Sequence, residues 1–206
     1  MQQYENIDQY IGSLKQELES NSECGNSWYN LGVALLAKRE FMEAERALRE
    51  AVSCSPKLAE GYVQLGGIAL QRGDLEGCLN FNLQASKIRP FFAPPWGNIG
   101  FCYLQQGEVD KSIKALKRAL KYDSNFLQAL ATIGSAYFQE GDLESAEDSL
   151  KKALALQPNF GPAWNNLALI RMEQGKYAEA RECLDKAKES GYDVPDDLVR
   201  EAEAKL

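Results

Sequence analysis

The sequence predicts an all-α protein built from a row of stacked helical hairpins, and three recurrences along the chain support this. Bulky residues recur at a constant interval of 34 residues, at Trp28, Tyr62, Trp96, Leu130 and Trp164. Three residues after each of them comes Leu31-Gly32, Leu65-Gly66, Ile99-Gly100, Ile133-Gly134 or Leu167-Ala168. An alanine recurs in every copy, at Ala51, Ala85, Ala119, Ala153 and Ala187. A fixed interval of this length indicates a repeat array in which each repeat is one supersecondary unit.

Each repeat contains two apolar patterns of helical period, separated by a short polar break. Four of the breaks contain a glycine, in Gly73-Asp74, Gly107-Glu108, Gly141-Asp142 and Gly175-Lys176. Glycine tolerates the left-handed conformation that ends a helix, and the acid in the first three breaks suits the start of the next helix. The first repeat has Arg39-Glu40 instead. Pro94-Pro95 and Pro162 fall at predicted helix starts, where the missing amide costs little.

Small residues at facing positions, such as Gly134 and Ala146, predict that the two helices of a repeat approach closely. The ends differ from the repeats. Residues 4–20 are predicted to form an amphipathic helix with Leu14 and Leu18 on its apolar face, and residues 192–206 are charged and contain few apolar residues. We expect one elongated domain, because no linker interrupts it. Its predicted parts are an N-terminal capping helix or half repeat in 1–24, repeats in 25–58, 59–92, 93–126, 127–160 and 161–191, and a C-terminal capping helix in 192–206.

The repeated pattern resembles the tetratricopeptide repeat (TPR) family. The first repeat carries it as Trp28, Leu31, Gly32, Leu35, Ala44, Leu48, Ala51 and Pro56. The second repeat departs from the pattern at Ala69 and Asn82, and the fifth at Arg171 and Tyr192. The resemblance implies an α-solenoid superhelix of antiparallel helix-turn-helix repeats, TPR-like in geometry. It also implies that the first helices line a concave groove in which peptides bind.

Composition and charge exclude several function classes. The chain has 30 acidic against 23 basic residues and a net charge of −7, which disfavours nucleic acid and anionic membrane surfaces as partners. The start of the chain, MQQYENIDQY, is polar and acidic, unlike a secretory signal. No apolar run approaches the length needed to cross a bilayer. We therefore expect no membrane insertion and a cytoplasmic location.

The sequence offers no assembled chemistry. It contains no histidine and no glycine-rich phosphate loop, because its glycines follow the repeat interval. Its five cysteines are widely spread, which fits reduced thiols, and Cys54, Cys78 and Cys102 are expected to be small core residues. We expect no enzyme activity, no cofactor and no metal site.

Charge is distributed unevenly between the two helices of each repeat. Second helices carry most of it, whereas segments 25–37, 61–71, 91–105 and 126–139 contain no Asp, Glu, Lys or Arg. The resemblance implies that the groove is lined by residues on these first helices. The implied positions are Tyr29, Val33 and Leu36, then Val63, Gly67 and Leu70, then Gly97, Phe101 and Leu104, then Ala131, Ser135 and Phe138, then Asn165, Leu169 and Met172.

Neutral polar side chains run beside these positions, in two tracks. The first track is Asn30, Gln64, Asn98, Thr132 and Asn166, and the second is Gln71, Gln105, Gln139 and Glu173. Amide side chains both donate and accept, so a row of them can pair with the backbone of an extended segment. Phe101 and Phe138 are expected to be exposed, because other residues already fill the packing positions of their repeats. For Leu36, Leu70, Leu104 and Met172, packing against the next repeat is an equally good interpretation.

One family subtype grips a C-terminal carboxylate with a clamp of Lys and Asn. The matching positions hold Tyr29, Val33, Gln64, Pro94 and Asn98, so the basic members are absent. The neutral groove favours a protein or peptide ligand with apolar side chains. The first hypothesis is therefore a non-catalytic protein-interaction scaffold. The alternative is a self-associating homo-oligomer whose groove receives a terminal helix of another copy, and an enzyme ranks last.

Overall fold

The computed structural model describes residues 6–205, which fold into helices connected by short turns, with no strand among them. The twelve helices are α1 (Ile7–Ser20), α2 (Gly25–Ala37), α3 (Phe41–Cys54), α4 (Ala59–Gln71), α5 (Leu75–Ile88), α6 (Ala93–Gln105), α7 (Val109–Tyr122), α8 (Leu127–Glu140), α9 (Leu143–Leu156), α10 (Gly161–Glu173), α11 (Tyr177–Glu189) and α12 (Asp196–Ala204). The all-α prediction is confirmed.

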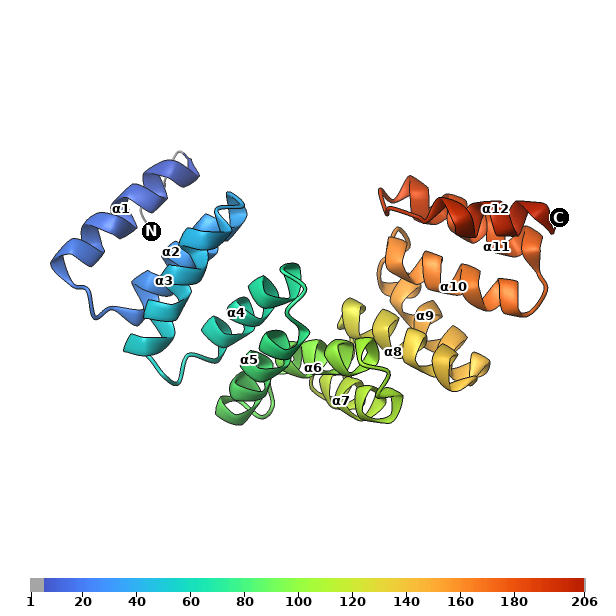
Figure 1. Ribbon diagram of the computed structural model, residues 1–206, viewed down its shortest axis with the longest axis horizontal. Helices are drawn as coiled ribbons and strands as arrows, with labels where there is room; N and C mark the ends of the chain where they lie inside the picture. The colour runs from blue at the N-terminus through green and yellow to red at the C-terminus, as the bar shows by residue number, and fades with distance from the viewer. Residues whose placement is uncertain (1–5, 206) are drawn as a thin grey trace. The chain divides into compact units, whose positions relative to one another are not determined.

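Each predicted repeat contains two of these helices, joined by a tight turn. Helices α2 and α3 lie side by side, as do α4 and α5, α8 and α9, and α10 and α11 (Figure 1). Helix α6 begins at Ala93 and α10 at Gly161, so the prolines at 94, 95 and 162 lie in the first turns as predicted. The order of elements is that of an α-solenoid.

The chain divides into two compact units, one up to Asn98 and one from Ile99 onward, so that the boundary falls within α6. The first unit has an apolar core centred on α1, α2 and α3, with Leu31, Leu35 and Leu48 almost fully buried. The second unit has its own core, built from α8 to α12, which includes Leu150 and Leu184. Each unit therefore buries its own apolar surface.

The turns inside the repeats adopt the predicted left-handed conformation. Gly73, Gly107, Gly141 and Gly175 have φ between 72° and 84°. At the equivalent place in the first repeat, Arg39 adopts the same conformation with φ of 61°, which is strained for a residue with a Cβ atom. The following acid caps the next helix in two of the three predicted cases, where Asp74 accepts from Gly77 N and Asp142 from Ser145 N. Glu108 makes no such bond. Its longer side chain pairs with Lys111.

The helices of a repeat approach closely at the predicted glycines. A Cβ atom at Gly134 would lie 2.8 Å from Leu150 Cδ2, and one at Gly32 would lie 2.6 Å from Leu48 Cγ. The second repeat differs in the residue that faces its glycine. Gly66 faces the fully buried Asn82, where the other repeats have a leucine.

In three of the repeats, a tryptophan side chain donates a hydrogen bond to a backbone carbonyl in the turn before the repeat. Trp28 Nε1 donates to Ser22 O (2.7 Å), Trp96 Nε1 to Pro90 O (2.9 Å) and Trp164 Nε1 to Pro158 O (2.7 Å). The recurring bulky position thus packs and also satisfies a carbonyl of the preceding turn.

The terminal helices cover the cores of their own units. Helix α1 buries Ile11, Leu14 and Leu18, and its first predicted residues before 6 lie outside the described part of the chain. Helix α12 buries Val199 and Ala202. The polar faces of both helices remain exposed, as capping elements require.

The cysteine prediction was right for two positions and wrong for one. Cys78 and Cys102 are buried, whereas Cys54 is exposed. Cys54 is the last residue of α3, and its Sγ lies 3.7 Å from Ser22 O in the loop before α2. A residue at the end of a helix is covered on fewer sides than one in the middle.

Candidate functional site

The first helices carry little charge, and the charge they do carry lies near their ends. The structure extends α4 to Glu60 and α8 to Glu140, which the uncharged segments of the sequence did not include. Glu60 pairs with Arg89 in the loop that precedes α6. The middle of α2 and of α4 remains free of ionic side chains.

The first unit exposes a neutral stripe along α2 and α4. Asn30 and Val33 are exposed on α2, and Val33 is 37% accessible. On α4 the corresponding residues are the half-buried Gln64 and the exposed Gly67, where an added Cβ would meet no atom within 4 Å. Gln71 continues the stripe at the end of α4. Open space, an exposed apolar residue and neutral amides thus occur on these two helices.

Other residues implied as groove-lining in this unit are half-buried. Tyr29 and Leu36 pack partly against the core of the first unit, and Leu70 is half-buried on α4. For Leu36 and Leu70, packing within the unit therefore covers part of the side chain, and the rest remains exposed.

Asn98 forms a contact that its place in the polar track did not predict. Its Nδ2 donates to Asn82 Oδ1 (3.0 Å), and Asn82 Nδ2 donates to Cys78 O (2.8 Å). Because Asn82 is fully buried, the bond from Asn98 supplies its side-chain oxygen with a donor. Asn98 therefore joins α6 to α5, and its donor is engaged within the chain.

In the second unit, the two aromatics expected to be exposed are covered more than predicted. Phe101 and Phe138 are both half-buried, and Phe138 packs against the core of the second unit. Leu104 is 6% accessible, so packing prevails there, while Gln105 beside it is exposed. A truncation of Phe138 would therefore lower the stability of the second unit as well as change its exposed surface.

Asn166 ties two first helices together in the second unit. Its Nδ2 donates to Ser135 Oγ (2.7 Å) and Ala131 O (3.4 Å), which joins α10 to α8. Leu169 and Met172 are half-buried one turn or more further along α10. The neighbouring Asn165 has its Oδ1 buried without a partner in the described residues.

Arg171 forms an ion-pair network on the other side of α10. In the sequence, this residue stands out only as a departure from the repeat pattern. Arg171 contacts Glu147 on α9 and Glu179 on α11, at 2.8 and 2.9 Å. The hydrogen bonds from Arg171 and Lys151 lower the pKa of Glu147 from 4.5 to about 2. This network joins α9, α10 and α11.

Sequence reasoning also missed a pocket of about 370 Å³ in the first unit. It lies between α1, α2 and α3 and is lined in part by Trp28, Leu31 and Leu35. Within residues 6–205, no group of three or more His, Cys, Asp or Glu side chains is arranged to hold a metal ion. No helix in that range is both long and apolar enough to cross a membrane.

Comparison with protein-family models identifies the family. Three models, each described as Tetratricopeptide repeat, match residues 137–206, residues 91–159, and residues 11–59 together with 29–77. The chain belongs to the tetratricopeptide repeat family, whose members are generally non-catalytic scaffolds for protein interactions. The comparison with curated proteins finds no match.

Solved structures share the fold. A chain of the APC/C hetero-tetramer Cut9-Hcn1 superposes with a TM-score of 0.84 at 17% identity, over 96% of this chain and 39% of that one. This chain thus spans 39% of the length of that relative. YrrB, described as a TPR protein with an unusual peptide-binding site, gives 0.70 at 18% identity over 95% and 100% of the two chains. PilW, a type IV pilus biogenesis factor, gives 0.76 at 21% identity over 88% and 87%. At these identities the likeness shows the fold alone.

Proposed function

We propose that this chain is a scaffold that binds an uncharged, partly apolar segment of a partner protein on its first helices. The observation that carries the proposal is the neutral stripe of the first unit. Asn30 and Val33 on α2 and Gly67 on α4 are exposed there, in helix segments that carry no ionic side chain.

The chemistry of the stripe suits a segment with a neutral sequence. A charged segment would lose its hydration on docking and find no opposite charge on the stripe. Burial of an unpaired ion costs on the order of several kcal/mol, so charged ligands are disfavoured. Asn30 and Gln64 offer donors and acceptors to a peptide backbone, and Val33 offers an apolar contact. The open space over Gly67 leaves room for a side chain of the ligand.

The likeness to YrrB supports this assignment at the level of the fold. The peptide-binding site in its description belongs to YrrB. We propose that a peptide or helix of a partner binds to α2 and α4 of this chain, and that the residues of the neutral stripe set the specificity.

The test is a quantitative capture experiment with three forms of the full chain. The wild type is compared with a Val33→Lys, Gly67→Lys variant and with an Asn80→Lys, Gln84→Lys control, whose positions are exposed on α5. All three should give the same helical circular dichroism. A partner identified by mass spectrometry should be lost from the stripe variant and retained by the control. Equal capture by all three forms would remove the proposal.

Self-association is the alternative occupant of the stripe. Sedimentation velocity over a range of protein concentrations distinguishes it. A concentration-dependent oligomer that the two stripe substitutions dissociate would assign the surface to a second copy of the chain, whereas a constant monomer leaves it to another protein.

A further inference from the structure

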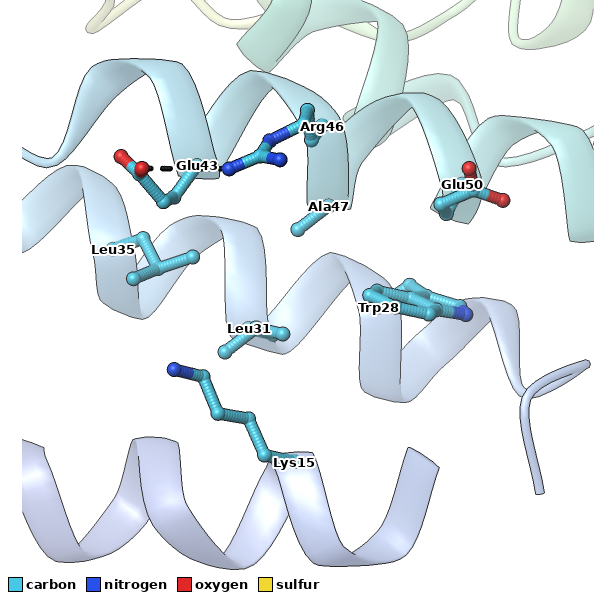
Figure 2. A pocket seen from close by; sticks show the side chains of 8 residues that line it. All are labelled: Lys15, Trp28, Leu31, Leu35, Glu43, Arg46, Ala47 and Glu50. Atoms are coloured by element: carbon cyan, nitrogen blue, oxygen red, sulfur yellow. Dashed lines mark hydrogen bonds and ion pairs between the residues drawn. The ribbon is translucent and has the colours of Figure 1, made fainter. Parts of the chain in front are cut away.

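The pocket of the first unit lies on the face of α2 that points away from the neutral stripe. Its lining comes from three helices, with Lys15 on α1, Trp28, Leu31 and Leu35 on α2, and Glu43, Arg46, Ala47 and Glu50 on α3. Leu31 and Leu35 each lie two residues from Val33 and so point about 160° away from it around the helix axis, which places the pocket and Val33 on opposite sides of α2. Figure 2 shows an apolar floor with Glu43 near one end and Glu50 near the other, beside Trp28.

The pocket lies beside the short side chain of Leu35, and the second repeat carries the still shorter Ala69 at the equivalent position. Leu35 occupies the repeat position that holds Tyr103, Tyr137 and Arg171 in the last three repeats. Arg171 reaches from α10 to Glu147 on α9 and Glu179 on α11, and so closes the gap between those two second helices. Leu35 is too short to span the corresponding gap between α1 and α3, and a space of about 370 Å³ remains.

The fifth repeat indicates what chemistry suits this space. There, the Arg171 guanidinium lies 2.9 Å from the Glu179 carboxylate, and Lys186 Nζ lies 4.4 Å from the centroid of the Trp164 ring. The same repeat positions in the first repeat hold Leu35 with Glu43, and Glu50 with Trp28. The first repeat therefore has the acid and the indole of these contacts without the two cations.

The acids of the pocket are available to a ligand. Glu50 forms no ion pair or hydrogen bond with any other residue in 6–205, and Glu43 pairs only with Arg46 on its own helix, at 3.4 Å. Both side chains of that pair are more than half exposed, so the pair contributes little and is readily exchanged. Lys15, on the opposite wall, is the one lining cation within 6–205 that has no ion pair.

We propose that this pocket binds a segment of a partner protein that carries a basic side chain next to an apolar one. The apolar side chain rests on Leu31, Leu35 and Ala47. The basic group lies between the Glu50 carboxylate and the Trp28 ring, where it reproduces the contact that Lys186 makes with Trp164. The net charge of −7 on the chain favours approach of a basic segment.

The indole N–H signals of the three tryptophans provide the test. The full chain, labelled with ¹⁵N, is titrated with acetyl-Ser-Leu-Lys-Ala-Leu-Arg-amide and, separately, with acetyl-Ser-Leu-Glu-Ala-Leu-Glu-amide. Trp28→Phe assigns the signal of Trp28. The basic peptide should shift this signal saturably and leave those of Trp96 and Trp164 in place, and the acidic peptide should shift none of them.

Three variants make the assignment specific. Glu50→Gln should weaken binding of the basic peptide by roughly threefold, the size of an exposed ion pair. Leu35→Tyr, which installs the residue of the third and fourth repeats, should fill the pocket and abolish the shift. Lys15→Ala should strengthen binding by removing a like charge.

Several results would overturn the proposal. They are an absent shift with the basic peptide, equal or tighter binding of the acidic peptide, an unchanged titration in Glu50→Gln, or weaker binding in Lys15→Ala. If Leu35→Tyr unfolds, which circular dichroism reports, the Glu50 and Lys15 variants still decide. Val33→Lys should leave the titration unchanged, because its side chain lies on the other face of α2.

Discussion

Arg171 and Glu147 meet through two parallel hydrogen bonds, from Nη1 to Oε2 and from Nη2 to Oε1, both 2.8 Å long. The side chains are 12% and 20% exposed, and Arg171 occupies a position that holds tyrosine in the two preceding repeats. A guanidinium thus replaces an aromatic ring between two second helices, and it needs the carboxylate to be ionised.

This pair makes stability depend on pH in a defined window. The pKa of Glu147 is lowered from 4.5 to about 2, so its contribution to the free energy of unfolding is complete above pH 4.5 and is lost as the pH falls toward 2. We expect a contribution of about 2 kcal/mol after allowance for solvent screening. Urea unfolding at a series of pH values measures it. In Glu147→Gln this part of the pH dependence should vanish, whereas the exposed Glu144→Gln on the same helix should retain it.

Two adjacent glycines on α4 should respond oppositely to the same substitution. Gly67 faces open space, so Gly67→Ala should raise the free energy of unfolding by roughly 0.5–1 kcal/mol through helix propensity. At Gly66, a Cβ atom would lie 2.3 Å from Asn82 Nδ2, so Gly66→Ala should lower it by about 1–3 kcal/mol through overpacking. Chemical denaturation of both variants measures the difference. Equal effects would mean that α4 and α5 are not in close contact at Gly66.

The left-handed turn at Arg39 should accept glycine with a gain in stability. Arg39→Gly relieves the conformational penalty of a Cβ atom at φ of 61°, and the flexibility of glycine in the unfolded chain offsets part of the gain. We expect a net stabilisation of about 0.5 kcal/mol. The reverse change at the equivalent position, Gly107→Ala, should destabilise by about 1 kcal/mol. A lower melting temperature in Arg39→Gly would contradict the conformational argument.

Removal of the Asn98 amide should harm the protein mainly through Asn82. Asn98→Ala leaves the buried Oδ1 of Asn82 without its donor, which should cost about 1–3 kcal/mol. Asn82→Leu installs the residue that the other four repeats carry there. In that background Asn98→Ala should cost much less, and a double-mutant cycle by urea unfolding gives the coupling. Identical losses in both backgrounds would show that Asn98 acts independently of Asn82.

The sequence was sufficient for the architecture because repeat packing depends on residues that recur. Gly134 faces Leu150 and Gly141 turns the chain, and each has counterparts at the same positions in other repeats. Exposure along the first helices was harder to predict. Phe138 and Leu104 belong to the same apolar pattern, but how far each is covered depends on neighbours contributed by other helices.

Side-chain size at one repeat position gives only a partial sequence signal for the pocket of the first unit, because Ala69 at this position of the second repeat is smaller still. Leu35 stands where Tyr103 and Tyr137 stand in later repeats, and the difference in length is visible in an alignment of the repeats. The hydrogen bond between Asn82 and Asn98 was harder to predict. Its only sequence signal is Asn82 itself, a polar residue at a position that holds leucine in the other repeats. Only the three-dimensional pairing assigns it a partner.

The Asn82–Asn98 bond also makes the junction between the second and third repeats chemically specific. A duplication or deletion between the second and third repeats would place the buried amide of Asn82 against a different first helix, and neighbours offering threonine or glutamine there would have to adopt new geometry to satisfy it. Repeats joined only by apolar contacts tolerate such shuffling more readily. A change in the number of repeats at this junction is therefore expected to destabilise the protein more than a change at a junction that rests on apolar contacts alone.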